Sequence, residues 1–216
     1  MNKLKISASL WSGELDRLAD SIKKVDLYVD SYHFDIMDNN YVQGFLFSAP
    51  IIKSLRKHTT KSFDAHLMCQ NPISTIDELV DAGVDTFMIH FNTCENLEDT
   101  LATIHNKQKK LGLVLNVDEA VEKVIPYLEY LNVVVLMGTE LGIKGVTFNT
   151  EVYNKIAQLR EYSCKYNFDI QIDGGIRKNT VPDMILNGAN VITIGSLLFE
   201  NNYEEIRSWY DNLSRC

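Results

Sequence analysis

Eight short apolar segments recur along the 216-residue chain, and helical periodicity follows most of them. Residues near the ends of these segments lie 21 to 36 positions apart. Strands that alternate with helices at such spacings predict βαβ units and a parallel sheet. Eight near-equal units without a break favour a closed (β/α)8 TIM barrel of the α/β class, formed by residues 1–216 as a single compact domain. The predicted strands are 4–10, 32–37, 62–68, 86–91, 111–116, 133–137, 169–173 and 191–195.

Helical segments are expected at 14–25, 73–82, 97–109 and 152–166. Gly83, Asn167 and Gly188 lie just before the next strand, where helices often end. The alternative fold is an open doubly wound sheet, which normally has a GxGxxG turn after its first strand. The residues Ser9-Leu10-Trp11-Ser12-Gly13 do not form that motif, so the closed barrel is the prediction.

Charge and composition exclude several classes of protein. Lys and Arg number 21 against 29 Asp and Glu, a net charge of −8. Binding to nucleic acid or to an anionic membrane surface needs an excess of cationic side chains. The chain has neither a signal-peptide segment nor an apolar run of about 18 residues, and its four cysteines form no CxxC pair. We expect a cytoplasmic protein without nucleic-acid or membrane partners.

Histidine and aspartate side chains gather at the ends of three predicted strands. Because strand side chains alternate, His33 and Asp35 face one side of the second strand, and His66 takes the matching side of the third. Asp173 ends the seventh strand. In a barrel these ends meet at one mouth, so the four side chains are expected to converge. Two imidazoles and two carboxylates suit a divalent metal such as zinc, iron, manganese or cobalt. His90 ends the fourth strand without an assigned role.

Glycine-containing turns follow the last three predicted strands. Asp173-Gly174-Gly175 ends the seventh and Gly195-Ser196 ends the eighth, while Gly142 and Gly145 lie in the loop after the sixth. The loops after strands seven and eight of a barrel often bind phosphate through backbone N–H groups. These fixed dipoles attract an anion locally even when the chain is acidic overall. A phosphorylated ligand is therefore expected.

Four motifs occur in the order found in a known enzyme family. They are His33-Phe34-Asp35-Ile36-Met37-Asp38, Phe63-Asp64-Ala65-His66-Leu67-Met68, Gly112-Leu113-Val114-Leu115-Asn116 and Ile172-Asp173-Gly174-Gly175-Ile176. On these motifs the chain resembles the ribulose-phosphate 3-epimerases over nearly its whole length. The resemblance implies an isomerase of a small-molecule sugar phosphate. One divalent metal ion, zinc as first choice, would be bound by His33, Asp35, His66 and Asp173.

The resemblance also implies roles for individual residues. Asp35 and Asp173 would be the acid/base pair that epimerises D-ribulose 5-phosphate to D-xylulose 5-phosphate through a metal-stabilised enediolate. Met37, Met68 and Met137 would form an apolar wall over the intermediate, and the enzyme would be a homo-oligomer. The residues expected to bind substrate are Ser9, His66, Gly142, Ile143, Lys144, Gly145, Gly174, Gly175, Gly195 and Ser196.

Two loops depart from the family pattern. A Gly and a Phe-Val-Pro-Asn run are usual after the second strand, where this chain has Asn39-Asn40-Tyr41-Val42-Gln43-Gly44. After the sixth strand, Leu141-Gly142-Ile143-Lys144-Gly145-Val146 replaces Pro-Gly-Phe-Gly-Gly-Gln. We expect the second loop to close over the phosphate, with Lys144 adding a cation.

These departures leave alternatives open. Within the class, the alternative is a hexulose-phosphate 3-epimerase that converts D-allulose 6-phosphate to D-fructose 6-phosphate. A further alternative is a non-catalytic protein that binds a sugar phosphate. A barrel decarboxylase or aldolase is disfavoured, because the third strand has Asp64-Ala65-His66 rather than Asp-x-Lys, and no lysine ends a predicted strand.

Overall fold

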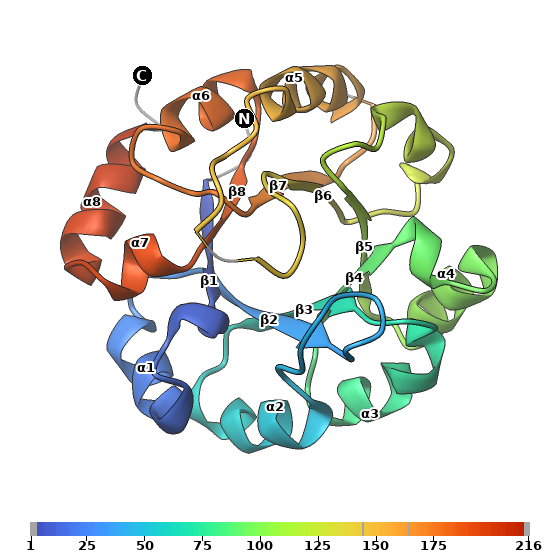
Figure 1. The fold of residues 1–216 in the computed structure, drawn as a ribbon, viewed down its shortest axis with the longest axis horizontal. Coiled ribbons are helices and arrows are strands. Elements are labelled where there is room, and N and C mark those ends of the chain that lie inside the picture. The colour runs from blue at the N-terminus through green and yellow to red at the C-terminus, as the bar shows by residue number, and fades with distance from the viewer. Residues whose placement is uncertain (1–3, 144, 164, 214–216) are drawn as a thin grey trace.

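The structure, a computed structural model, describes residues 4–143, 145–163 and 165–213. Its strands run parallel and close into a barrel in chain order, with β8 hydrogen-bonded back to β1 (Figure 1). This confirms the predicted (β/α)8 barrel, and every predicted strand agrees with an observed one to within one residue at each end. The strands are β1 (Lys5–Ser9), β2 (Ser31–Met37), β3 (Ser62–Met68), β4 (Thr86–His90), β5 (Lys110–Leu115), β6 (Val133–Met137), β7 (Asp169–Asp173) and β8 (Val191–Ile194).

Helices cover the outside of the barrel (Figure 1). The side chain of Asn96 caps α4 by accepting a 3.2 Å hydrogen bond from the Asp99 amide. Gly188 ends α6 with φ +123°, a conformation that glycine adopts without strain. The α-helices are α1 (Leu18–Val25), α2 (Ala49–Leu55), α3 (Ile76–Asp81), α4 (Leu97–Asn106), α5 (Val152–Ser163), α6 (Val181–Asn187), α7 (Ser196–Phe199) and α8 (Tyr203–Leu213).

The connection between β5 and β6 is fully described and contains no α-helix, unlike the other connections between consecutive strands. Two short 3-10 helices, Val121–Lys123 and Ile125–Tyr127, take its place. Pro126 lies inside the second of them, and proline has no amide hydrogen to continue an α-helix. The predicted repeat of eight units therefore holds for the strands, while one helix is replaced by tighter turns.

Alternate residues of each strand face opposite sides of the barrel wall. In β2, Tyr32 and Phe34 are fully buried and belong to the large hydrophobic core cluster, which also includes helix residues. His33 and Asp35, between and after them, are also buried but lie in the polar group described below. Because its side chains alternate, this strand contributes apolar side chains to the core on its outer face and polar side chains to the inside of the barrel.

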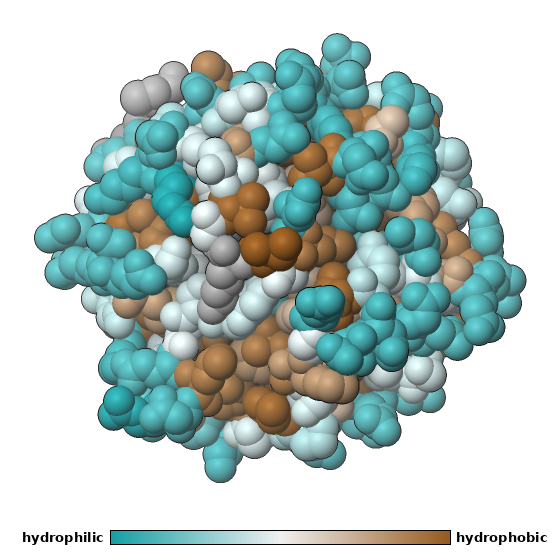
Figure 2. All heavy atoms as spheres, in the orientation of Figure 1, coloured by the Kyte–Doolittle hydropathy of each residue, from teal (hydrophilic) through white to brown (hydrophobic). Residues whose placement is uncertain are grey.

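Loops from opposite sides of the barrel meet over its mouth. The segment after β6 crosses the middle of the view and approaches the segment after β2 (Figure 1). A side chain at Gly142, where φ is +71°, would come within 3.2 Å of Val42. On this face, hydrophilic residues form the rim, and hydrophobic residues lie near the centre and around α2 (Figure 2). In the described part of the chain, no helix is long and apolar enough to span a membrane.

Candidate metal centre and active site

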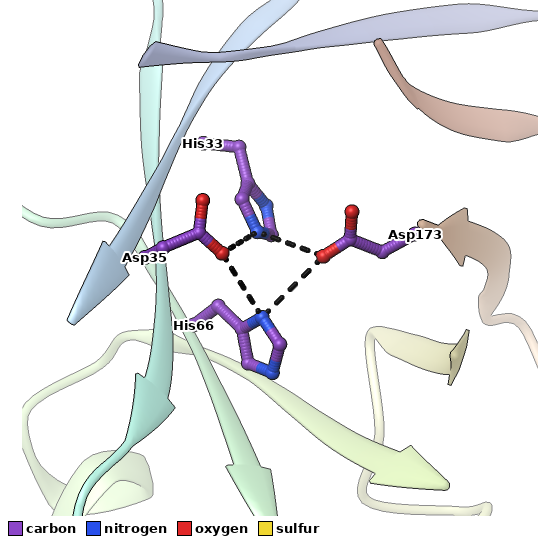
Figure 3. A group of neighbouring side chains, drawn as sticks. All are labelled: His33, Asp35, His66 and Asp173. Atoms are coloured by element: carbon purple, nitrogen blue, oxygen red, sulfur yellow. Dashed lines mark ion pairs between the residues drawn. The ribbon is translucent and has the colours of Figure 1, made fainter. Parts of the chain in front are cut away.

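Four side chains predicted to converge do so inside the barrel. His33 and Asp35 come from β2, His66 from β3 and Asp173 from the end of β7. The register of β2 and β3 pairs Asp35 with His66, which brings these two side chains together. One ligand atom from each of the four residues lies within 4.8 Å of the others. The two carboxylates approach from opposite sides, with one imidazole above and one below (Figure 3).

The distances within this group suit a bound cation. His33 Nε2 is 3.3 Å from Asp35 Oδ1 and 3.2 Å from Asp173 Oδ2, and His66 Nδ1 is 3.4 Å from each of the same oxygens. Both nitrogens are buried and have no hydrogen-bond partner among the described residues. Four tetrahedral bonds of about 2.0–2.1 Å would place ligand atoms roughly 3.3–3.4 Å apart. These residues therefore fit one divalent metal ion.

Electrostatic effects keep both carboxylates ionised. Burial raises the pKa of Asp35 and Asp173, but the nearby imidazoles have the larger combined effect and leave both pKa values below the usual range. Burial lowers the pKa of His33, yet the two carboxylates raise that pKa well above its ordinary value. The pKa of His66 is raised by the same carboxylates, again against the effect of burial. A divalent cation would replace the protons on these imidazoles, since histidine binds metals in its neutral form.

Asp35 is also held from its other side. Ser9, at the end of β1, donates a 3.1 Å hydrogen bond from its hydroxyl to Asp35 Oδ2. The Asp35 side chain is 6% exposed and that of Asp173 is 13% exposed, so both reach the pocket beside them only at their tips. Asp173 accepts no hydrogen bond through Oδ1 from any described residue. One carboxylate is thus oriented by a hydroxyl group, and the other has a free oxygen.

A pocket of about 580 Å³ adjoins the centre and is partly lined by Asp35, His66 and Asp173. Met68 and Met137 line it as well, whereas Met37 lies beneath Gly44 and Gly142 and is not a lining residue. Two of the three methionines expected to form an apolar wall therefore line the pocket. Lys144 lies outside the described residues. The other residues expected to bind substrate all line the pocket: Ser9, His66, Gly142, Ile143, Gly145, Gly174, Gly175, Gly195 and Ser196.

Backbone amides at the ends of β7 and β8 are available to an anion. The amides of Gly174, Gly175, Gly195 and Ser196 donate no hydrogen bond within the described chain. Gly174 and Gly175 have φ values of +91° and +70°, and a side chain at Gly174 would come within 2.4 Å of the Thr139 hydroxyl. Glycine is therefore needed at position 174 both for its backbone conformation and for the close approach of Thr139.

Sequence reasoning missed one residue of this region, Arg177, and left another, His90, without a role. Arg177 lines the pocket beyond the glycine pair, and its guanidinium is bonded to the Ile176 carbonyl but to no carboxylate among the described residues. A cationic side chain three residues after Gly174, in a loop expected to bind phosphate, was the sequence signal that could have identified it. His90 Nε2 lies 2.8 Å from His66 Nε2, and the two rings stack at 5.0 Å. Burial, followed by the proximity of His66, lowers the pKa of His90 well below its ordinary value.

Solved structures similar to this chain show the same fold. A tryptophan synthase α-subunit from Pyrococcus furiosus superimposes with a TM-score of 0.72, at 14% sequence identity, over 100% of this chain and 97% of that one. A chain of the tryptophan synthase complex from the same organism gives a TM-score of 0.70 at 15% identity. At these identities the likeness extends to the barrel fold alone.

Sequence comparisons are more specific. The chain is 33% identical to a ribulose-phosphate 3-epimerase of Schizosaccharomyces pombe, over 98% of this chain and 94% of the relative. It is 35% identical to the cytoplasmic isoform from Oryza sativa, over 90% and 87% of the two chains. The model of the ribulose-phosphate 3-epimerase family matches residues 5–199. The chain therefore belongs to the ribulose-phosphate 3-epimerase family.

Proposed function

We propose that this protein is a metal-dependent 3-epimerase that interconverts D-ribulose 5-phosphate and D-xylulose 5-phosphate, a reaction of the pentose phosphate pathway. The observation that carries the proposal is the placement of Asp35 and Asp173. These carboxylates approach the same two imidazoles from opposite sides and both line one pocket (Figure 3). Epimerisation needs proton removal from one face of a carbon and proton return to the other. Membership in the family supports this reaction.

His33, Asp35, His66 and Asp173 would hold one divalent ion, with zinc as first choice and iron, manganese or cobalt as alternatives. The bound ion would supply Lewis-acid stabilisation of the negative charge that develops when the proton next to the ketone is removed. The two neutral imidazoles add no charge to the site. With both carboxylates ionised, the divalent ion and its four ligands would carry no net charge.

Asp35 and Asp173 would share the proton transfers. One group, as a carboxylate, takes the C3 proton from one face of the ketose, which leaves a planar enediolate. The other group, which must enter the step as a carboxylic acid, gives its proton to the opposite face, and the two roles are exchanged in the reverse reaction. The lowered pKa values of the two groups favour the ionised form, in which either group can act as the base. The Ser9 hydroxyl would hold the Asp35 carboxylate in place while Asp35 takes or returns a proton. Met68 and Met137 would exclude water from the reacting carbon.

The phosphate would lie against the amides of Gly174, Gly175, Gly195 and Ser196. We propose Arg177 as an additional cation on this side, since it lines the pocket without a carboxylate partner in the described chain. Glu140 and Glu200 line the same pocket, so the amides and Arg177 would have to attract the phosphate against the repulsion of these two carboxylates. The loop residues Gly142, Ile143 and Gly145 would cover the pocket. Lys144, by its position in the sequence, would add a cation near the phosphate.

The test is a side-by-side assay of the metal-loaded protein with D-ribulose 5-phosphate, D-allulose 6-phosphate and unphosphorylated D-ribulose. We expect kcat/KM to be highest for the pentulose phosphate and lowest for the free sugar. A higher value for the hexulose phosphate would assign the protein to the alternative substrate. Binding of the phosphates without turnover would contradict the enzymatic proposal and favour a non-catalytic binding protein.

The cellular setting belongs to the same proposal. The Oryza sativa relative is named as a cytoplasmic isoform, and we propose the cytoplasm for this protein too. We also propose that it forms a homo-oligomer and binds neither nucleic acid nor membranes. Light scattering with size-exclusion chromatography would measure the oligomeric state, and a mass equal to one chain would contradict it.

A further inference from the structure

His90 is a fully buried histidine that the proposed mechanism does not use. It ends β4, beside β3 in the barrel wall, and its ring lies almost parallel to that of His66, at an interplanar angle of 27°. The two Nε2 atoms are 2.8 Å apart, which is a hydrogen-bond distance. A hydrogen bond between two ring nitrogens requires that one donates a proton and the other accepts it.

The position of His66 decides the direction of this hydrogen bond. Its Nδ1 faces Asp35 and Asp173, and its Nε2 points away from them (Figure 3). To bind a cation, Nδ1 must carry a lone pair, so the proton of the neutral ring must be on Nε2. His66 then donates to His90 Nε2, and His90 carries its own proton on Nδ1.

We propose that His90 is a positioning residue that holds His66 in the tautomer and ring orientation needed to bind the metal through Nδ1. This inference rests on the metal site of the proposed function. Histidine ligands commonly donate their second N–H to a carboxylate, a carbonyl or a water molecule. Here the acceptor is a neutral imidazole. It orients the ligand without adding a third negative charge beside an intermediate that is itself an anion.

The surroundings of His90 suit this role. The ring of Tyr41 lies 5.1 Å from the His90 ring. The Tyr41 hydroxyl donates to Asn92 at 2.9 Å and accepts from Asn116 at 3.2 Å, so the loop after β2 is tied to the ends of two other strands. His90 Nδ1, which carries the ring proton in this arrangement, is buried and has no acceptor among the described residues, so the hydrogen bond from His66 must hold the tautomer by itself. No described carboxylate forms an ion pair with His90, which leaves His66 as the ring's hydrogen-bond partner.

Two substitutions distinguish the effect of the acceptor nitrogen of His90 from the effect of its ring. His90→Phe keeps a flat ring against Tyr41 but removes the acceptor nitrogen, whereas His90→Gln can place an amide oxygen near the position of Nε2. His105→Phe, on the exposed side of α4, serves as the matched control. Zinc affinity of the whole protein is measured by competition with a chelator of known affinity. We expect His90→Phe to weaken zinc binding by about 10–100-fold, His90→Gln to restore most of that loss, and the control to match the parent protein.

Thermal unfolding of the metal-free variants checks that the fold survives each substitution. A ¹⁵N–¹H spectrum of the zinc-loaded parent protein then reads the tautomers directly, with the proton expected on Nε2 of His66 and on Nδ1 of His90. Equal loss of affinity in the Phe and Gln variants, unchanged affinity in His90→Phe, or a proton on Nε2 of His90 would each overturn the inference. A parent protein that binds no divalent ion would instead contradict the proposed metal-dependent function.

Discussion

The interior of the barrel has two halves of opposite character. Strands β4 to β6 contribute an apolar cluster that is separate from the large outer core, made of Met88, Val114, Val133, Val135 and Met137. The strands of the other half bury polar and charged side chains, including Ser7, His33, Asp35, Asp64, His66, Gln171 and Thr193. Both halves are closed off from water, yet the buried groups that can hold or move a proton lie in the second half, apart from His90 at the end of β4.

The difference shows where the molecule accepts a cost in stability. An apolar wall needs only close packing, whereas a buried polar group must find partners inside the protein. Some polar residues do so, as when Gln171 donates a 2.8 Å hydrogen bond to the Thr193 hydroxyl. The central nitrogens of His33 and His66 find no such partner within the described chain. Buried groups left in this state are characteristic of functional sites rather than of structural cores.

The largest expected effect concerns the carboxylates of the polar half. Asp35→Asn and Asp173→Asn should each lower kcat by about 10²–10⁴-fold, because each removes the group that takes or returns a proton. The measurement is turnover of D-ribulose 5-phosphate by protein whose metal content is determined in every variant. Near-normal turnover by both metal-replete variants would contradict the proposed proton transfers.

Isotope exchange sharpens the same prediction. A variant that retains the base for one epimer should still exchange the C3 proton of that epimer with D₂O, while failing to convert it. The two Asn variants should therefore differ in which epimer they exchange. Mass spectrometry of recovered substrate measures this, and loss of exchange with both epimers in both variants would argue against division of the task between two carboxylates.

Metal affinity should depend on pH with a definite sign. The carboxylates raise the pKa of His33 in the metal-free protein, so its proton persists above the ordinary histidine range and must leave when metal binds. Zinc affinity should therefore rise with pH by about tenfold per unit for each proton displaced, and level off above the raised pKa of His33. Calorimetry in two buffers of different ionisation enthalpy counts the protons released. Affinity that falls on going from pH 6 to pH 8 would be the opposite of this expectation.

A substitution in the apolar half should lower the stability of the protein and leave its kcat unchanged. Val135 is fully buried, and Val135→Ala should lower the free energy of unfolding by about 1–3 kcal/mol through lost contacts and a small cavity. Its kcat should stay close to that of the parent protein at a temperature where both are folded. Urea unfolding together with steady-state kinetics tests this. A large fall in kcat with unchanged stability would show that the two halves are not separated as described.

The smallest expected effect is at Ser9. Ser9→Ala removes the hydrogen bond to Asp35 Oδ2 and should lower kcat by roughly fivefold, equivalent to about 1 kcal/mol. Ser62→Ala is the matched control, because its hydroxyl donates to the buried Asp64 carboxylate outside the metal group. Steady-state kinetics at full metal occupancy compares the two. Equal effects would mean that the Ser9 hydroxyl has no special relation to the reacting carboxylate.

Much of the site follows from local pattern alone. The two-residue period of a strand places His33 and Asp35 on one face without knowledge of the fold, and near-equal spacing of strands predicts closure. Closure then brings the strand that ends in Asp173 to the same mouth. No helical segment is predicted between the fifth and sixth strands, and Pro126, whose missing amide hydrogen is a local signal, lies in one of the short 3-10 helices that the structure has there.

The sequence by itself thus determined the barrel, its order of strands and the four residues at its centre, because periodicity and spacing are properties of short stretches of chain. The tertiary structure decided which nitrogen of His66 faces the carboxylates, that the other nitrogen lies 2.8 Å from His90 Nε2, and that Met37 lies against Gly44 and Gly142 without lining the pocket. It also placed Arg177 at the pocket. These outcomes depend on side-chain rotamers and on distances between strands far apart in the sequence, which only packing across the closed barrel can set.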